Sequence, residues 1–501
     1  MTETAIEEAA KSGMTEVERD REEALARLAE VGGKLTAEED VIFQGTTLVI
    51  PEKMELRDAI RFLEDKQAED EEEMSFGRTF QFRPWDGARA TQAALKRAFG
   101  MMRQQATYSF FGKNPPELRS IPVSVHEEEQ VPWGNLTIPM LRGATFSLGA
   151  MKDPEMGSLF HLSCTAPRKY RFHIEGIFNL VKDELERSSM YRGKAFDGQV
   201  MPKFLDLDGV DESKVIYSDD VVTQLEANVW TLLRHTERLR ELGTPLKRAV
   251  LFEGPYGTGK TLAAYLTAKL SVANGWTFVY CRPGRDNLRD VMATAQLYQP
   301  SVVFFEDVDV VAQSGETDAV SDLLDIFDGI QAKGTEIIAV LTTNHVERIH
   351  KGMMRPGRLD SVIHVGALDP PGIRRLVEAT VSGDLLDAGV DWAAVAESME
   401  GYVPAFCREA IDRAVRYNLA RNDGEVTKLS TEDFVGAAEG LRPQFALMEG
   451  AGEGIRGDAL GKALARTVES AVDGLGVVRT GADRSDLWAT LAAPEESLTG
   501  R

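Results

Sequence analysis

This sequence has few cysteines, no long apolar run and no excess of basic residues. Only three cysteines occur in 501 residues, and they are scattered, which favours a reducing compartment over a disulfide framework. No apolar stretch approaches the roughly 20 residues that a membrane-spanning helix needs. The N-terminal residues are acidic and lack the basic and apolar regions of a secretory signal peptide. We therefore expect a cytoplasmic protein that does not enter a membrane.

The balance of charge is strongly acidic, with a formal net charge of −23 at pH 7. Non-specific binding to nucleic acid depends on Lys and Arg that neutralise phosphates, so this balance argues against it. The same charge argues against binding to an anionic membrane surface. The apolar fraction, 43%, is typical of a globular protein, and the length favours two to four domains with a substantial core.

A glycine-rich segment stands between the apolar run 249–252 and the helix-forming run 262–270. It reads Gly254-Pro255-Tyr256-Gly257-Thr258-Gly259-Lys260-Thr261, and Leu262 follows. The glycines let the backbone curl so that N–H groups face phosphate oxygens, and the next helix offers its positive end. Lys260 is suited to the β- and γ-phosphates, and the Thr261 hydroxyl is suited to Mg²⁺. The nine residues from Gly254 to Leu262 are therefore predicted to bind ATP.

Two further apolar runs predict buried strands of a parallel sheet, and each ends in polar residues. The run 302–305 leads into Glu306-Asp307-Val308-Asp309, and the run 337–341 leads into Thr342-Thr343-Asn344. At the carboxyl ends of parallel strands, one carboxylate can hold Mg²⁺ and another can deprotonate the attacking water. Asn344 is suited to bind the γ-phosphate or that water. The alternatives are an acidic loop after a core strand and an ordinary turn asparagine.

A fourth segment, Arg355-Pro356-Gly357-Arg358, brings two arginines to a loop that proline stiffens. Guanidinium groups stabilise the charge that develops during phosphoryl transfer. By itself the segment means little, because most exposed arginines are solvated.

Taken together, the four segments resemble the AAA ATPases of the group that carries the second region of homology, over about residues 215 to 445. The resemblance implies an α/β P-loop AAA+ module, a parallel sheet with flanking helices, plus a small helical lid. It implies ATP and Mg²⁺ as cofactors, with Thr261 and Glu306 at the metal. It assigns Glu306, Asp307 and Asn344 to catalysis, and it implies that Arg355 and Arg358 act on the nucleotide of a neighbouring subunit. We therefore expect a homo-oligomeric ring, usually a hexamer, that remodels or threads a macromolecule.

The acidic pair departs from the family pattern, because the family has Asp before Glu and this chain has Glu306 before Asp307. Glu306 aligns with the metal-binding residue and Asp307 with the catalytic base. Aspartate is one methylene shorter, which would set the base about 1.5 Å further back. A misplacement of that size can cost about a hundredfold in rate. Three interpretations are open: the strand shifts to compensate, the enzyme is slow, or the two acids exchange roles. We favour slow or compensated activity.

The loop after the predicted strand 277–281 is short and lacks the aromatic tip of many protein-threading relatives. Arg282 and Arg285 stand in this loop, where they could grip an acidic peptide or a phosphate backbone, or simply be solvated. Tyr280 is expected to have a core or rim position in the strand. Pro404 stands where relatives have a glycine near the nucleotide, so contacts from that stretch stay open.

The organisation along the chain predicts five parts. They are an acidic, partly helical or flexible segment (1–75), an α+β N-terminal domain (76–210), the AAA+ core (211–369), a helical lid (370–445) and a C-terminal helix with a flexible tail (446–501). Within them we expect a helix at 16–30, a solvated linker at 69–73, helices at 88–103 and 171–187, and an apolar helical stripe at 460–475. By analogy with the family, the domain at 76–210 binds a substrate or an adaptor.

The leading hypothesis is a ring-forming ATPase that couples Mg-ATP hydrolysis to chaperone-like remodelling of protein substrates or complexes. The first alternative is a motor that handles nucleic acid, which the overall charge opposes. The second is a nucleotide-gated assembly scaffold with slow hydrolysis, which the reversed acidic pair suggests. The sequence has no His-Glu-x-x-His, the zinc-binding motif of an attached protease.

Overall fold

The computed structural model describes residues 42–44, 47–49, 55–109, 112–198, 201, 203–310, 335–349, 352, 355, 358–425 and 427–452. The predicted helix at 16–30 and the predicted stripe at 460–475 lie outside these residues. The contacts of the chain divide it into two compact units, one ending at Gly366 and one beginning at Ala367, and each is described by itself. No helix within the described residues combines the length and the apolarity needed to cross a bilayer.

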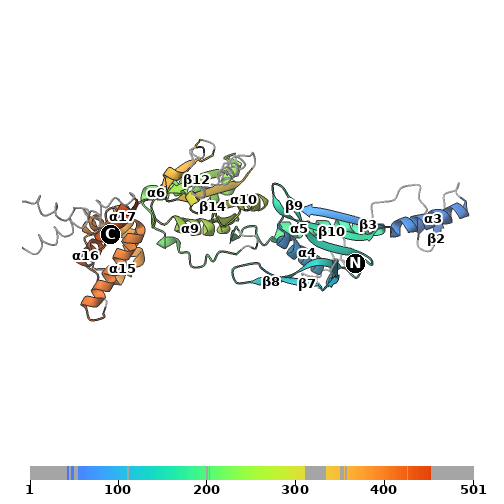
Figure 1. Cartoon of the computed structure of the whole chain (residues 1–501), viewed down its shortest axis with the longest axis horizontal. Helices are drawn as coiled ribbons and strands as arrows, with labels where there is room; N and C mark the ends of the chain where they lie inside the picture. The colour runs from blue at the N-terminus through green and yellow to red at the C-terminus, as the bar shows by residue number, and fades with distance from the viewer. Residues whose placement is uncertain are drawn as a thin grey trace, which may run out of the picture. The chain divides into compact units, whose positions relative to one another are not determined.

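The first unit begins with an antiparallel sheet covered by two helices (Figure 1). Its strands, in spatial order, are β3 (Glu73–Phe80), β10 (Gly157–Pro167), β9 (Thr145–Asp153), β8 (Glu128–Thr137) and β4 (Arg103–Gln104), and β7 (Glu117–Pro122) also pairs with β8. Helices α4 (Pro84–Phe99) and α5 (Arg171–Ser188) pack against each other and against β10. A Cβ atom at Gly87 would lie 1.9 Å from the Phe160 ring, so glycine allows α4 to rest directly on the sheet. The expected α+β fold is thereby confirmed. The helix predicted at 171–187 is α5, whereas the helix predicted at 88–103 begins and ends four residues earlier, as α4.

The acidic run at 69–73 is not the linker that the sequence predicts. Helix α3 (Leu56–Glu71) continues through most of it, and β3 begins at Glu73. The run is solvated, because Glu69, Glu71, Glu72 and Glu73 are all exposed. Ion pairs from Arg168 and Lys169 to this stretch help the chain to stay ordered despite the repulsion between the acids. Two short hairpins complete this part, β1 (Ile42–Gln44) with β2 (Thr47–Val49) and β5 (Thr107–Ser109) with β6 (Gly112–Asn114).

A six-stranded parallel sheet follows, which confirms the predicted α/β fold. Its spatial order is β11 (Ala195–Asp197), β13 (Thr277–Cys281), β14 (Ser301–Phe305), β15 (Ile337–Thr343), β12 (Arg248–Glu253) and β16 (Ser361–His364). Alternate residues of the central strands enter two different cores, as the two-residue period of a strand requires. Helix α9 (Lys260–Ala273) covers one face, together with α6 (Asp219–Leu225), the π-helix η3 (Glu226–Trp230) and α7 (Thr231–Arg234). Helix α8 (Thr236–Glu241) follows α7, and α10 (Leu288–Leu297) covers the other face.

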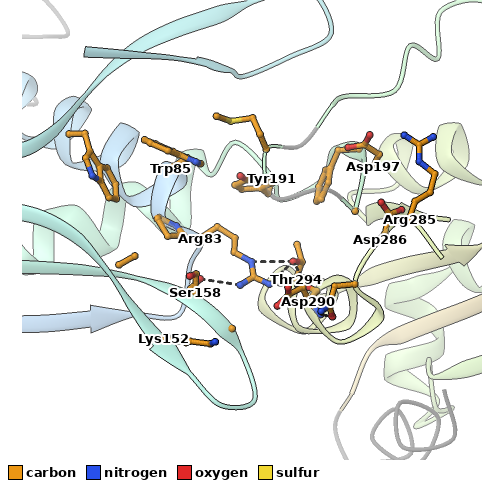
Figure 2. A pocket seen from close by; sticks show the side chains of 18 residues that line it. Arg83, Trp85, Lys152, Ser158, Tyr191, Asp197, Arg285, Asp286, Asp290 and Thr294 are labelled. Atoms are coloured by element: carbon orange, nitrogen blue, oxygen red, sulfur yellow. Dashed lines mark hydrogen bonds between the residues drawn. The ribbon is translucent and has the colours of Figure 1, made fainter. Parts of the chain in front are cut away.

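The antiparallel domain is joined to α10 through the side chain of Arg83 (Figure 2). Its guanidinium donates to the Thr294 hydroxyl and the Asp290 carbonyl on α10, and to two carbonyls in the hairpin between β9 and β10. Close by, the Tyr298 hydroxyl accepts from the Arg83 backbone N–H and donates to the buried carboxylate of Asp86. We call these three residues, Arg83, Asp86 and Tyr298, the junction. A pocket of about 920 Å³ opens beside it, with Trp85, Lys152 and Arg285 among its lining residues.

The second unit is a bundle of helices, as the periodicity of the sequence predicts. They are α13 (Pro370–Thr380), α14 (Trp392–Ser398), α15 (Pro404–Arg421), α16 (Thr431–Glu439) and α17 (Arg442–Gly452). Their starts follow from the sequence: Asp369 caps α13 by accepting from the Gly372 N–H, and Ser430 forms a capping box with Asp433. Pro404 occupies the first turn of α15, where its missing N–H costs nothing.

Candidate active site

The glycine-rich segment leaves the carboxyl end of β12 and leads straight into α9. Gly254, Gly257 and Gly259 all have positive φ angles, between 82° and 153°, which residues with a Cβ atom rarely adopt. At Gly254 a Cβ atom would also lie 2.1 Å from the Val365 carbonyl oxygen, so the loop passes too close to the chain after β16 for any other residue. The predicted nucleotide-binding residues therefore form one tight turn at the N-terminus of a 14-residue helix, which favours an anion.

Lys260 is the first residue of α9 and is buried. Its ammonium group donates to the carbonyl oxygens of Gly254 and Pro255, at 2.7 and 2.8 Å, so it lies inside the turn. Burial lowers the pKa of Lys260 to about 8, and nearby carboxylates, first among them Asp307, act in the opposite direction. The ammonium group is therefore still mostly protonated at pH 7 and supplies positive charge where phosphates would bind.

The two acids after β14 separate towards different neighbouring strands. The Glu306 N–H donates to the Cys281 carbonyl at the end of β13, at 2.9 Å. The next residue, Asp307, has a φ of 51°, and its N–H donates to the Thr342 hydroxyl on β15, also at 2.9 Å. This left-handed turn points consecutive side chains in different directions.

Each acid then meets a different partner. The Glu306 carboxylate accepts a 2.7 Å hydrogen bond from the Thr261 hydroxyl. The Asp307 carboxylate accepts a 3.0 Å hydrogen bond from the Asn344 amide. Glu306 thus lies beside the residue suited to Mg²⁺, and Asp307 lies beside the residue suited to the γ-phosphate or the water.

The environment of Asp307 suits a proton acceptor. Its pKa is raised, first by burial and then by the negative charges of Glu306 and Asp309. A carboxylate with a raised pKa is a stronger base, so this arrangement favours the removal of a proton from water. Asp309 itself is buried, and its carboxylate accepts from the Thr343 hydroxyl at 2.9 Å. The carboxylate therefore faces the end of β15 and not Thr261.

Thr261 and Glu306 fit Mg²⁺ by the nature of their oxygen atoms. Mg²⁺ is usually held by one or two protein groups together with water and substrate phosphates. A hydroxyl and a carboxylate that already touch each other at the mouth of the loop meet that requirement. Within the described residues, no three His, Cys, Asp or Glu side chains gather as a metal cluster, so a site enclosed by protein alone is not seen there.

The two arginines of the fourth segment lie at the other end of the sheet. Asp360 follows them, and its N–H and carboxylate bond the backbone of Ala249 at the start of β12. The glycine-rich loop leaves the opposite end of β12, a six-residue strand that spans roughly 20 Å. Arg355 is exposed, and Arg358 donates to the Gly352 carbonyl at 3.1 Å. The structure of one chain therefore does not bring these arginines to its own Lys260.

Comparisons with known proteins agree with this geometry. Residues 250–367 match the family model described as "ATPase family associated with various cellular activities (AAA)". The chain is 30% identical over 242 residues to the Cell division cycle protein 48 homolog of Archaeoglobus fulgidus, an alignment that covers 42% of this chain and 32% of the relative.

Residues 250–367 of this chain are a domain of the AAA ATPase family.

Other relatives share the same region. The chain is 28% identical over 239 residues to the ATP-dependent zinc metalloprotease FtsH 2 of Thermoanaerobacter sp., covering 44% of this chain and 45% of that protein. It is also 28% identical over 239 residues to Protein CdcH of Halobacterium salinarum, covering 42% and 32%. The alignments thus span between about a third and a half of the length of these relatives.

Sequence reasoning did not identify two residues that hold this site together. The hydroxyl group of the buried Tyr217 donates to the Gly259 carbonyl at 2.7 Å, inside the glycine-rich loop. The hydroxyl of Thr342 accepts from the backbone N–H of Asp307 and orients it. No local pattern marks these two residues, because their partners lie 42 and 35 residues away. Tyr280, which was expected in the core or at a rim, is buried.

The short loop after β13 is a tight turn closed by its own residues. Asp286 accepts from the Arg282 N–H at 2.7 Å, and the N–H groups of Arg285 and Asp286 both donate to the Arg282 carbonyl. The two arginines of the turn diverge: Arg282 extends towards Glu306, whereas Arg285 is exposed and lines the pocket beside the junction (Figure 2). They do not form one patch that could grip a ligand with both guanidinium groups.

Proposed function

We propose that this chain is a ring-forming ATPase that couples Mg-ATP hydrolysis to the remodelling of protein substrates or complexes. The observation that carries the proposal is the division of the site between the two edges of the parallel sheet. Lys260, Thr261, Glu306, Asp307 and Asn344 gather at the carboxyl edge. Arg355 and Arg358 lie at the amino edge, so a second copy of the chain is needed to bring arginines to the nucleotide.

The roles of the residues follow from their partners. The glycine-rich loop and Lys260 bind the phosphates, and Thr261 and Glu306 hold Mg²⁺. Asp307 accepts a proton from the attacking water, which Asn344 orients. Arg355 and Arg358 of a neighbouring copy stabilise the charge of the transition state. Mg²⁺, when bound, neutralises the phosphate oxygens on which that charge develops.

Remodelling of proteins is proposed from the family relationship. The relatives include a protein named as an ATP-dependent zinc metalloprotease, but this chain lacks the His-Glu-x-x-His motif. We therefore propose that it moves or unfolds substrates without cutting them, and that the antiparallel domain recognises the substrate or an adaptor. A hexameric ring and a cytoplasmic location stay predictions of the sequence.

Mixing two inactive variants tests the shared site. Arg355→Ala should bind ATP but hydrolyse it at least about tenfold more slowly, because a donor to the transition state is lost. Lys260→Ala should bind ATP about a hundredfold more weakly, so its own site stays empty at an ATP concentration that fills the site of the other variant. Mixed rings would regain turnover wherever an intact loop faces an intact arginine. Mixtures that form rings and stay inactive would count against the shared site.

Paired substitutions of the acids test the assigned roles. Asp307→Asn should still bind Mg-ATP and lose hydrolysis, since an amide cannot accept the proton. Glu306→Gln should mainly raise the Mg²⁺ concentration that binding requires. The two phenotypes would be interchanged if the roles were exchanged. Near wild-type turnover in both variants would refute either assignment.

A scaffold that assembles on ATP and hydrolyses it slowly is the second candidate. The hydrogen bond from Asn344 already occupies one oxygen of Asp307, a side chain shorter than the glutamate of the family. Tight ATP binding and ring formation with negligible turnover of the wild type would favour the scaffold over the motor. ATPase activity that nucleic acid stimulates in a salt-sensitive way would instead favour the nucleic-acid motor.

A further inference from the structure

The pocket beside the junction has a wall of aromatic side chains from the antiparallel domain (Figure 2). Trp85 lies in the first turn of α4 and Trp133 lies on β8, and their ring centroids are 4.8 Å apart. Both rings are only half-buried, and both line the pocket of about 920 Å³. A concave site of this size with aromatic walls has the dimensions and the chemistry of a ligand site.

Tyr191 lines the same pocket and is 3% exposed. Its ring packs against the rings of Tyr298 and Phe196, with centroids 5.0 and 5.2 Å away. Among the residues that the structure describes, none forms a hydrogen bond with its hydroxyl. Enclosed polar groups normally have a partner, because an unmade hydrogen bond costs free energy. The hydroxyl is therefore available to a group that enters the pocket.

Two exposed cations also line the pocket, Lys152 on β9 and Arg285 in the turn after β13. Neither side chain has an ion pair or a hydrogen bond with any other described residue. The indole N–H groups of Trp85 and Trp133 likewise have no acceptor within the described part of the chain. All four side chains can donate hydrogen bonds and none of them accepts, so the pocket suits a ligand that supplies acceptors.

The carboxylates that line the pocket already have partners in the protein. Asp197 and Asp286 each accept from a backbone N–H, at 2.8 and 2.7 Å. The Asp290 carboxylate lies beside the Arg83 guanidinium, since a Cβ atom at Gly157 would be 2.9 Å from the one and 3.1 Å from the other. The charge left for a ligand is therefore positive, but these acids would still repel a polyanion such as a strand of nucleic acid. A ligand with one or two negative charges fits best.

The aromatic wall and the free donors together define the ligand. Indole rings attract another aromatic ring in an offset or edge-on arrangement, and Lys and Arg form their strongest hydrogen bonds with carboxylates. We propose that the pocket binds a segment of a protein chain in which acidic residues flank an aromatic residue. Lys152 and Arg285 are exposed, so they can meet acids on either side of the ring in an extended segment. This inference rests on the proposed function, because it names the kind of sequence that the remodelling ATPase would recognise.

The test is a calorimetric titration of the wild-type chain, without nucleotide, with three capped peptides. They contain Asp-Trp-Asp, Asp-Ala-Asp or Lys-Trp-Lys between glycines. We expect Asp-Trp-Asp to bind, and the other two peptides to bind at least about tenfold more weakly, because each lacks either the ring or the carboxylates. Absence of binding by Asp-Trp-Asp, or equal binding of all three peptides, would overturn the inference.

Charge reversal shows whether the peptide occupies this pocket. Lys152→Glu and Arg285→Glu should each weaken the binding of Asp-Trp-Asp about tenfold, and together they should reverse the preference in favour of Lys-Trp-Lys. Lys182→Glu is the matched control, because it makes the same change of charge at an exposed position on α5 that does not line the pocket. Equal effects of Lys152→Glu and Lys182→Glu would place the peptide elsewhere on the protein and overturn the inference.

Two further variants test the apolar part of the pocket without changing its charge. Trp133→Leu should weaken the binding of Asp-Trp-Asp about fivefold, and Tyr191→Phe, which keeps the ring, should weaken it about threefold. Unchanged affinity in both folded variants would contradict the inference. So would tighter binding of a short single-stranded oligonucleotide that is lost with Lys152→Glu, an outcome that would assign the pocket to nucleic acid.

The titration separates this inference from the proposed function. A wild type that hydrolyses ATP in mixed rings but does not bind Asp-Trp-Asp would overturn the pocket and leave the ATPase in place. A wild type that binds the peptide with the expected preference but never hydrolyses ATP would overturn the ATPase and leave the pocket in place.

Discussion

The junction and the nucleotide site both contain charged side chains that are at least partly buried, but these side chains form different sets of hydrogen bonds. At the junction, the Arg83 guanidinium donates five hydrogen bonds within the chain, and the Asp86 carboxylate accepts three. At the nucleotide site, Lys260 donates to carbonyls of its own loop, and no ion pair joins it to Asp307. Burial shifts the pKa values at both places.

The comparison shows that a shifted pKa does not by itself mark a functional site. Burial disfavours a charged group wherever it occurs, and structural networks shift pKa values as catalytic sites do. What separates the two regions is where their donors and acceptors point. The junction bonds connect the antiparallel domain to α10, whereas the groups at the nucleotide site converge on the N-terminus of α9.

Breaking the junction should have the largest effect on stability. Arg83→Met would remove the five hydrogen bonds that the guanidinium donates to α10 and to the hairpin of β9 and β10, at a cost of about 4 kcal/mol in the free energy of unfolding. Chemical denaturation followed by tryptophan fluorescence measures this loss. Arg238→Met is the matched control, because Arg238 is exposed and its ion pair with Glu241 lies on the surface one helical turn away, so it should cost less than about 0.5 kcal/mol. Equal costs for the two variants would contradict the structural role.

Removing Lys260 should instead affect binding and not folding. We expect Lys260→Ala to weaken ATP binding by about a hundredfold, or about 3 kcal/mol, because charge-assisted hydrogen bonds to the phosphates are lost. Calorimetric titration with ATP measures the change. Lys269→Ala, on the exposed side of the same helix, should keep wild-type affinity. Normal affinity in Lys260→Ala would refute the assignment of the loop.

The junction also predicts a dependence of stability on pH. Burial raises the pKa of Asp86 from 3.8 to about 6, against the opposing effect of its hydrogen bonds and of Arg89. Between about pH 4 and pH 6, Asp86 is protonated in the folded protein and ionised in the unfolded chain. The stabilisation that protonated Asp86 contributes is therefore fully present below about pH 4 and is lost as the pH rises to about 6. The loss should be about 2–3 kcal/mol.

Comparison with Asp86→Asn isolates that contribution, because the amide does not titrate. The difference in unfolding free energy between the wild type and the variant should fall by that amount from pH 4 to pH 7. A difference that stays constant with pH would show that Asp86 is ionised in the folded protein throughout this range.

The smallest expected effect concerns the support of the glycine-rich loop. Tyr217→Phe removes the hydrogen bond to the Gly259 carbonyl and keeps the ring against the loop. We expect ATP affinity to fall about fivefold, which corresponds to about 1 kcal/mol. Tyr170→Phe, the same change in the antiparallel domain, should have no effect on affinity. An unchanged affinity in Tyr217→Phe would show that the loop does not depend on this bond.

The elements with the clearest patterns are the ones that sequence analysis predicted well. The strand at 277–281 has the predicted bounds, and the helix predicted at 171–187 ends only one residue later, because an uninterrupted apolar run and a helical period are local properties. The acidic run at 69–73 was predicted wrongly. Charge repulsion favours a linker, but Arg168 and Lys169, about 100 residues away, form ion pairs with the end of α3, and Glu73 pairs with Pro167 of β10.

The sequence by itself determined the resemblance to AAA ATPases, the parallel sheet, the loop that carries Lys260, and the candidate residues at the strand ends. These features depend on the types of residues that stand close together in the sequence, so they can be recognised without the structure. Tertiary structure alone decided that Glu306 turns to Thr261 while Asp307 turns to Asn344. It also decided that Arg83 bonds Thr294, which lies 211 residues away in the sequence. The physical reason is that the pairing of the strands and the left-handed conformation of Asp307 set the directions of these side chains. Neither can be predicted from a local sequence pattern.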